Sequence, residues 1–376
     1  MNRSLKPKHT QSVNDVTILW FETSNRYAII ANGLFYYIQL YFTSDSETAF
    51  IQHCIQESKL PTTQATTLLN DIKGFLKDLN RPLNSEEPYP ETTLTQQYLF
   101  TTYYRCLGFQ FEINFESESL KEYIHPQIAH LETETNTNAD FSFQINTKHS
   151  TLQLFKNKNF IKAFEQRYYN KLQGKFNMEL LCSLYENTEH DWIGLLHAST
   201  ISNGQSSVTL IGTSGSGKST LTSLLAFNGY ELMADDTTPI LRENLHSYYF
   251  PGAISIKQGA FDILKPYAPQ IDTLPSCFLR SYKGPIKYLP TPEPTKTHLP
   301  CNTVVLVNYQ AKAETSLEAL SIKEALEILI PDSWLSPKPE NAKAFLNWIS
   351  TLTCYKLTYS NNTEAIAVFS TIFKNE

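Results

Sequence analysis

The stretch GTSGSGKST, residues 212–220, combines closely spaced glycines with one lysine and several hydroxyl side chains. Its spacing fits the pattern G-x-x-x-x-G-K-[ST]. In such a loop the backbone N–H groups and the positive end of the following helix bind phosphate, the lysine adds a fixed charge, and the serine hydroxyl is a ligand for Mg²⁺. The stretch therefore predicts a site for the phosphates of a nucleotide, formed by Gly212, Thr213, Ser214, Gly215, Ser216, Gly217, Lys218, Ser219 and Thr220.

Two adjacent carboxylates, Asp235 and Asp236, end the next expected strand, YELMADD, seventeen and eighteen residues after Lys218. In a parallel α/β layout this strand end points toward the crevice that holds the phosphates. One carboxylate could accept the proton of an attacking hydroxyl, and the other could help to hold Mg²⁺. We assign Asp235 as the proton acceptor and Asp236, together with Ser219, as the ligands of Mg²⁺. The reverse assignment of the two acids stays open. A solvated Asp-Asp turn is the alternative without chemistry.

His197 lies fifteen residues before Gly212, on the expected strand HASTIS. A neighbouring strand could bring its imidazole beside the Asp pair, where it would orient or tune the base. A core histidine with its hydrogen bonds satisfied is the alternative. Four cations further along the chain could contact the transferring phosphate or the substrate, although an exposed charge is the simpler interpretation of each: Lys257, Arg280, Lys283 and Lys287.

The phosphate loop alone is also compatible with a transporter ATPase. Such a protein would need an LSGGQ-like signature and an apolar strand that ends in a carboxylate. The downstream apolar stretch, TVVLVNYQ, ends in Asn308 without a carboxylate, and SGGQ does not occur in the sequence. The transporter interpretation is therefore excluded.

The pattern of the remaining chain predicts a small α+β module, a linker and a larger domain. Residues 1–82 contain a hairpin, VTILWF and RYAII, and three helical stretches, which is a winged-helix-like plan. Residues 83–95 are rich in proline and charge and are expected to be a linker. Within 96–376 we expect strands at 109–115, 141–146 and 151–155, a helix over 160–185, a hairpin over 197–212 around Asn203-Gly204, and a helix that Gly229 ends.

Composition restricts the class of protein further. The 376 residues carry a net charge of −6, which argues against a nucleic-acid binder. The first residues lack the apolar run of a signal peptide, no stretch is long enough to span a membrane, and the six cysteines have no CxxC pair. We therefore expect a cytoplasmic protein without a membrane partner.

The combination of His197, the loop 212–219 and Ala234-Asp235-Asp236, at these intervals, resembles the catalytic core of HPr kinase/phosphorylase. This resemblance covers residues 190–260 firmly and extends loosely to about 310. It implies an α/β fold with a P-loop core akin to that of ATP-dependent phosphoenolpyruvate carboxykinase, and ATP with Mg²⁺ as cofactors. By family role, the loop and Lys218 hold the nucleotide, Ser219 helps the metal, and the Asp pair with His197 handles the proton of a serine. The resemblance also implies a homo-oligomer.

One departure concerns the acceptor. The family's Glu-x-Arg-Gly stretch is missing, and GAISIKQGAFDIL occupies its place, which argues against phosphorolysis and against HPr as the substrate. The N-terminal module resembles the PqqD family of peptide carriers, which bind a leader peptide at the edge of the hairpin. We therefore expect an HPr-kinase-like serine kinase that acts on a peptide or protein. A kinase for free serine or a similar metabolite, and a nucleotide-gated peptide-binding protein without catalysis, are the alternatives.

Overall fold

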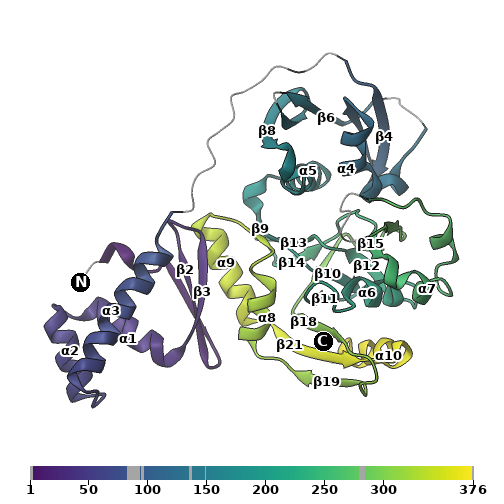
Figure 1. Ribbon diagram of the computed structural model, residues 1–376. Helices are drawn as coiled ribbons and strands as arrows, with labels where there is room; N and C mark the ends of the chain where they lie inside the picture. Colours follow the sequence, from purple (N-terminus) through teal and green to yellow (C-terminus); the bar gives the residue numbers. More distant parts are fainter. Residues whose placement is uncertain are drawn as a thin grey trace.

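The computed structural model describes residues 3–82, 94, 97–134, 138–148, 150–278 and 284–374 and shows a mixed α/β protein with several sheets (Figure 1). Apart from Leu94, the predicted linker 83–95 lies outside the described residues. Within the described residues, no helix has both the length and the apolar character that a membrane crossing requires.

The N-terminal module contains a three-stranded antiparallel sheet and three helices. The predicted hairpin is confirmed as β2 (Val16–Phe21) and β3 (Arg26–Ala31), and the three predicted helices are α1 (Asn32–Thr43), α2 (Glu47–Gln56) and α3 (Thr62–Leu79). A further strand that the sequence analysis did not predict, β1 (His9–Val13), pairs with β2, so the strand order is β1-β2-β3. Strand β2 is buried along its whole length, which explains its almost uninterrupted apolar sequence.

One face of this sheet packs on the module's own helices and the other on the C-terminal part of the chain. Leu19 and Phe21 belong to the apolar cluster of the module's helices, whereas Val16, Ile18 and Trp20 join a cluster formed largely by the segment 320–354. At the tip of the hairpin, the side-chain amide of Asn25 donates a hydrogen bond of 2.9 Å to the carbonyl of Leu335. The module is therefore docked through both apolar and polar contacts.

Replacing Trp20 by alanine is expected to lower the free energy of unfolding by about 3–5 kcal/mol, the usual cost of removing a buried tryptophan. Trp20 is fully buried, and its indole N–H donates to the side-chain oxygen of Asn25. Urea unfolding of wild type, Trp20→Ala and Trp20→Phe measures the effect, and Trp20→Phe should lose less because it keeps most of the apolar contact. An unchanged urea midpoint for Trp20→Ala would show that the N-terminal module is joined to the rest of the protein by the chain alone and does not pack on it.

A second sheet, order β4-β5-β6-β7-β8, follows the module, with helices α4 (Glu118–Ile128) and α5 (Tyr169–Leu184). Its strands are β4 (Phe100–Cys106), β5 (Phe109–Phe115), β6 (Phe141–Lys148), β7 (Thr151–Lys156) and β8 (Asn159–Glu165). The helix predicted over 160–185 is wrong at its start, because residues 159–165 form β8. Asn157 and Lys158 both have positive φ, as a two-residue hairpin turn requires, and they return the chain onto β7.

The remaining chain builds the layers that carry the predicted site. A six-stranded sheet has the order β12-β10-β11-β18-β21-β19, with β10 (Ser199–Ser202), β11 (Ser207–Ile211), β12 (Glu231–Ala234), β18 (Thr303–Tyr309), β19 (Ser316–Ala319) and β21 (Thr353–Tyr359). Helices α6 (Lys218–Ala226) and α10 (Asn362–Ile372) pack on one face, and α8 (Ile322–Leu329) and α9 (Pro339–Ser350) pack on the other. Strands β11, β18 and β21 are parallel, so their carboxyl ends meet at one edge.

A five-stranded sheet, order β17-β14-β13-β9-β20, and a short hairpin complete the fold. The sheet contains β9 (Trp192–Leu196), β13 (Thr238–Leu241), β14 (His246–Tyr248), β17 (His298–Pro300) and β20 (Trp334–Leu335). The hairpin pairs β15 (Ile254–Lys257) with β16 (Ile286–Leu289), and a short helix, α7 (Phe261–Leu264), lies between them in the chain. The predicted hairpin at Asn203-Gly204 is confirmed as β10–β11.

Candidate functional site

The loop 212–217 joins the carboxyl end of β11 to the first turn of α6, as the sequence predicts. Gly215 and Gly217 adopt left-handed backbone conformations with φ of 93° and 92°, which side-chain-bearing residues rarely adopt. A Cβ atom at Gly212 would clash with Ser216 Oγ, and one at Gly217 would lie 3.0 Å from Tyr309 Cβ. The loop therefore needs glycine for space at Gly212, for conformation at Gly215 and for both reasons at Gly217.

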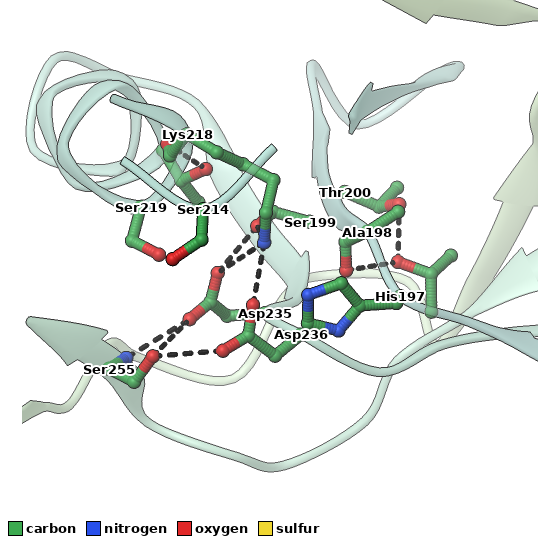
Figure 2. A network of polar contacts seen from close by, with 12 residues as sticks. His197, Ala198, Ser199, Thr200, Ser214, Lys218, Ser219, Asp235, Asp236 and Ser255 are labelled. Atoms are coloured by element: carbon green, nitrogen blue, oxygen red, sulfur yellow. Dashed lines mark hydrogen bonds and ion pairs between the residues drawn. The ribbon is translucent and has the colours of Figure 1, made fainter. Parts of the chain in front are cut away.

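Lys218 begins α6 and turns its ammonium group inward rather than to solvent (Figure 2). Its Nζ donates to Asp236 Oδ1 at 2.6 Å and to Ser199 Oγ at 3.1 Å, and lies 4.0 Å from Asp235 Oδ1. Burial by itself lowers the pKa of this lysine, but the charges of Asp236 and Asp235 outweigh that effect and raise it. Lys218 is therefore a buried cation balanced by the two acids that the sequence placed with it.

Asp235 is the inner member of the acid pair, with a side chain that is only 1% exposed. Its carboxylate accepts a hydrogen bond from Ser199 Oγ on one oxygen and from the backbone N–H of Ser255 on the other. Burial raises the pKa of Asp235 to about 6, with a further contribution from the charge of Asp236, while Lys218 and the two serines oppose the shift. Both oxygens thus have protein partners within the fold.

Asp236 is the outer member, and 40% of its side chain is exposed. Its backbone is left-handed, with φ of 56°, so the carboxylate turns away from the path of β12. Oδ1 accepts from Lys218 and Oδ2 from Ser255 Oγ at 2.9 Å. Burial acts to raise the pKa of this carboxyl, but the charges of Lys218 and then His197 hold it well below its usual range. Asp236 is the carboxylate of the pair that a molecule from solvent can reach.

His197 lies beside the pair, although not on a strand as the sequence analysis expected. It occupies the bend between β9 and β10 and is exposed, so the alternative of a core histidine is also wrong. The bend arises because β9 and β10 belong to different sheets. The backbone N–H of His197 donates to Ser333 Oγ at 3.0 Å, and Figure 2 shows the ring next to Asp236.

Of the four cations predicted from the sequence, the two that the structure describes lie at different places. Lys257, at the end of β15, donates to Ser214 Oγ in the loop at 3.1 Å, so it reaches the site. Lys287 lies elsewhere: its ammonium donates to the carbonyls of Ile271 and Asp272 and sits over the ring of Phe261. Arg280 and Lys283 lie outside the described residues.

Two further site residues, Ser199 and Ser255, were missed by the sequence analysis. Each one bonds to the acid pair, and Ser255 bridges the two acids, with its backbone N–H on Asp235 and its hydroxyl on Asp236. Serine is common in loops and strands, so the residue type alone does not indicate that Ser199 or Ser255 belongs to a functional site. Ser199, two residues after His197, could have been inferred from the hairpin, because the expected pairing brings β10 next to the phosphate-loop strand.

The residues of the site fit the two predicted cofactors. Ser216 Oγ is buried in the loop and has no hydrogen-bond partner among the described residues, and a Cβ atom at Gly215 would meet no atom within 4 Å, so the loop has free space at that position. For Mg²⁺, Ser219 and Asp236 are oxygen donors of the type that this ion prefers. In the parts of the chain that the structure describes, no group of three or more His, Cys, Asp or Glu could hold a metal, so Mg²⁺ would also need phosphate oxygens.

Comparison with known proteins leaves this geometry as the main guide. No protein-family model matches the chain, and no curated protein does.

The raised pKa of Asp235 predicts a pH dependence of stability. Because its folded pKa of about 6 lies above the ordinary 3.8, the protonated carboxyl favours the folded state, and this contribution is lost as the pH rises from about 4 through 6. Asp235→Asn cannot ionise. The unfolding free energy of wild type relative to Asp235→Asn should therefore fall by on the order of 3 kcal/mol between pH 4 and 7. Urea unfolding at several pH values measures it, and a constant difference would contradict the assignment.

Proposed function

We propose that this protein is an ATP- and Mg²⁺-dependent kinase that transfers a phosphoryl group to a hydroxyl, specifically the serine hydroxyl of a peptide or protein. One observation carries the proposal: the lysine of a phosphate-loop motif contacts two adjacent carboxylates, of which one is buried and the other exposed. Phosphoryl transfer needs a cation at the phosphate and a nearby proton acceptor, and this arrangement supplies both.

The nucleotide would bind at the loop 212–217 and the start of α6. The backbone N–H groups, the helix end and the orphaned Ser216 hydroxyl are donors for phosphate oxygens. Ser219 would hold Mg²⁺ together with the phosphates, and Mg²⁺ when bound neutralises their charge. Lys257, which already reaches Ser214, is a second cation close enough to meet the terminal phosphate.

Exposure decides which acid is proposed as the proton acceptor. A substrate hydroxyl can approach Asp236, whereas Asp235 is enclosed and bonded on both oxygens. We therefore propose that Asp236, and not Asp235, accepts the proton, so that Mg²⁺ is left to Ser219 and the phosphates. Asp235, bonded on both oxygens, holds Ser199 and Ser255 in place. His197 stands beside Asp236 and orients it.

The contact between Lys218 and Asp236 links nucleotide binding to the proton transfer. When phosphate attracts the ammonium of Lys218, Asp236 loses the charge that most strongly lowers its pKa. The pKa of Asp236 then rises toward that of an ordinary carboxyl, which makes it a better proton acceptor. Binding of the nucleotide would thus make Asp236 a stronger general base for the proton transfer.

The N-terminal module supports a peptide as acceptor. Strand β3 lies at an edge of its sheet, and among the described residues no strand other than β2 pairs with it, so an extended peptide could add there. Its hairpin is not remote from the site. Asn25 bonds to Leu335, and Ser333, two residues earlier in the chain, accepts from the backbone N–H of His197. The PqqD-like plan and the HPr-kinase-like site thus favour one enzyme in which the module presents the serine.

The acceptor is tested by incubating the full-length protein with Mg-ATP and three compounds: free serine, a serine-containing peptide library and the same library with serine replaced by alanine. Mass spectrometry then locates the phosphate. We expect phosphoserine in the first library and none in the alanine library. Phosphate on free serine alone would indicate a small-molecule kinase, and ATP binding without any phosphorylated product would indicate a nucleotide-gated peptide-binding protein.

A further inference from the structure

Tyr309, the last residue of β18, lies directly against the phosphate loop. Its backbone N–H donates to the carbonyl of Ser216 at 2.9 Å, and its Cβ is the atom that would obstruct a side chain at Gly217. The position of Tyr309 is therefore fixed by the loop itself and not by a remote surface.

The ring of Tyr309 is unusually exposed for an aromatic side chain that is anchored in this way. It is 47% exposed, while Tyr359, at the end of the adjacent strand β21, is buried. The two rings pack edge to face, with centroids 5.6 Å apart and an interplanar angle of 75°. Tyr359 thus supports Tyr309 from one side and leaves much of its ring accessible to solvent.

The order of the strands places this ring opposite the acid pair. In the sheet, β11 and its loop lie between β10 and β12 on one side and β18 and β21 on the other. Asp235 and Asp236 follow β12, and Tyr309 ends β18. A triphosphate that lies along the loop with its terminal phosphate at the acid pair therefore points its nucleoside toward Tyr309. The carboxyl ends of parallel strands are where such sheets bind ligands.

We propose that the ring of Tyr309 is the stacking platform for the nucleobase of the bound nucleotide. An aromatic ring can stack on any nucleobase, because every nucleobase has a π-face. A ring that is already anchored loses little conformational freedom when the nucleotide binds. This inference rests on the proposed function, since it assigns the base to a nucleotide whose phosphates occupy the loop.

The substitution Tyr309→Ala removes the ring alone, because alanine keeps both the Cβ and the backbone N–H that contact the loop. We expect it to weaken Mg-ATP binding by about 10- to 100-fold, the range of one stacked base. Tyr309→Phe keeps the π-face and should bind Mg-ATP as the wild type does. Tyr36→Ala is a matched control, because Tyr36 has the same exposed fraction but lies on α1 of the N-terminal module.

Isothermal titration with Mg-ATP and with inorganic tripolyphosphate separates the base from the phosphates. The inference predicts that Tyr309→Ala loses affinity for Mg-ATP and keeps its affinity for tripolyphosphate. Equal losses for both ligands, or no loss for either, would overturn the nucleobase assignment and leave the proposed function intact. A wild-type protein that binds neither ligand would overturn the proposed function and this inference with it.

Discussion

Asp236→Asn is expected to slow phosphoryl transfer by about 10²–10⁴, the usual contribution of a general base. Asparagine suits the left-handed backbone of this position. Its amide oxygen can accept from Lys218 and its NH₂ group can donate to Ser255 Oγ, so the local fold should persist. The variant loses the ability to take a proton from the acceptor hydroxyl. Single-turnover transfer from Mg-ATP to the acceptor peptide measures the rate, and titration measures the affinity for Mg-ATP, which should change little.

Asp235→Asn is the control for this experiment. We expect a smaller effect on the rate, because Asp235 is enclosed and acts through Ser199, Ser255 and Lys218. A loss of transfer in Asp235→Asn with full activity in Asp236→Asn would restore the assignment suggested by the sequence. Full activity in both variants would remove the acid pair from the chemistry.

Lys218→Ala is expected to abolish the stabilisation that Mg-ATP gives to the folded protein. A ligand at 100 times its dissociation constant adds about 2.7 kcal/mol to the stability of the wild type. The variant should show almost none of this, because it lacks the cation that the loop supplies to the phosphates. Differential scanning calorimetry with and without Mg-ATP measures the shift for each protein.

The shift, rather than the melting temperature itself, is the informative quantity for Lys218→Ala. Removing the ammonium leaves two neighbouring carboxylates without their counter-ion, which is costly in a buried setting. The variant should therefore melt lower even without nucleotide. Lys287→Ala is the control and should keep the full shift, since the ammonium of Lys287 donates to the carbonyls of Ile271 and Asp272 and not to the loop. An equal shift in Lys218→Ala and wild type would contradict the loop assignment.

The parts of the fold and of the site that depend on a short stretch of sequence could be predicted. The hairpin β2–β3, the loop with its helix α6, and Asp235 and Asp236 at the end of β12 each follow from a short stretch of chain. Local pattern was enough because the type of each element, and the place of these residues along it, follow from the residues next to them in sequence.

The rest depends on contacts between segments that are distant in sequence. The exposure of Asp236 results from its left-handed backbone and from Ser255, a residue of another strand. His197 lies on a bend because its two flanking strands join different sheets. Lys287 is directed to the carbonyl of Ile271 by the hairpin β15–β16. Residue type and spacing do not encode such pairings.

We propose that this site moves the terminal phosphate of ATP to a hydroxyl and that Asp236 takes the proton. The most direct test is a rapid-quench experiment with γ-labelled ATP, Mg²⁺ and the acceptor peptide, performed on wild type and Asp236→Asn. The account predicts that label reaches the serine hydroxyl in wild type, and at least about a hundredfold more slowly in the variant, while both bind Mg-ATP. Label that stays on ATP in wild type, or that reaches serine at equal rates in both proteins, would contradict it.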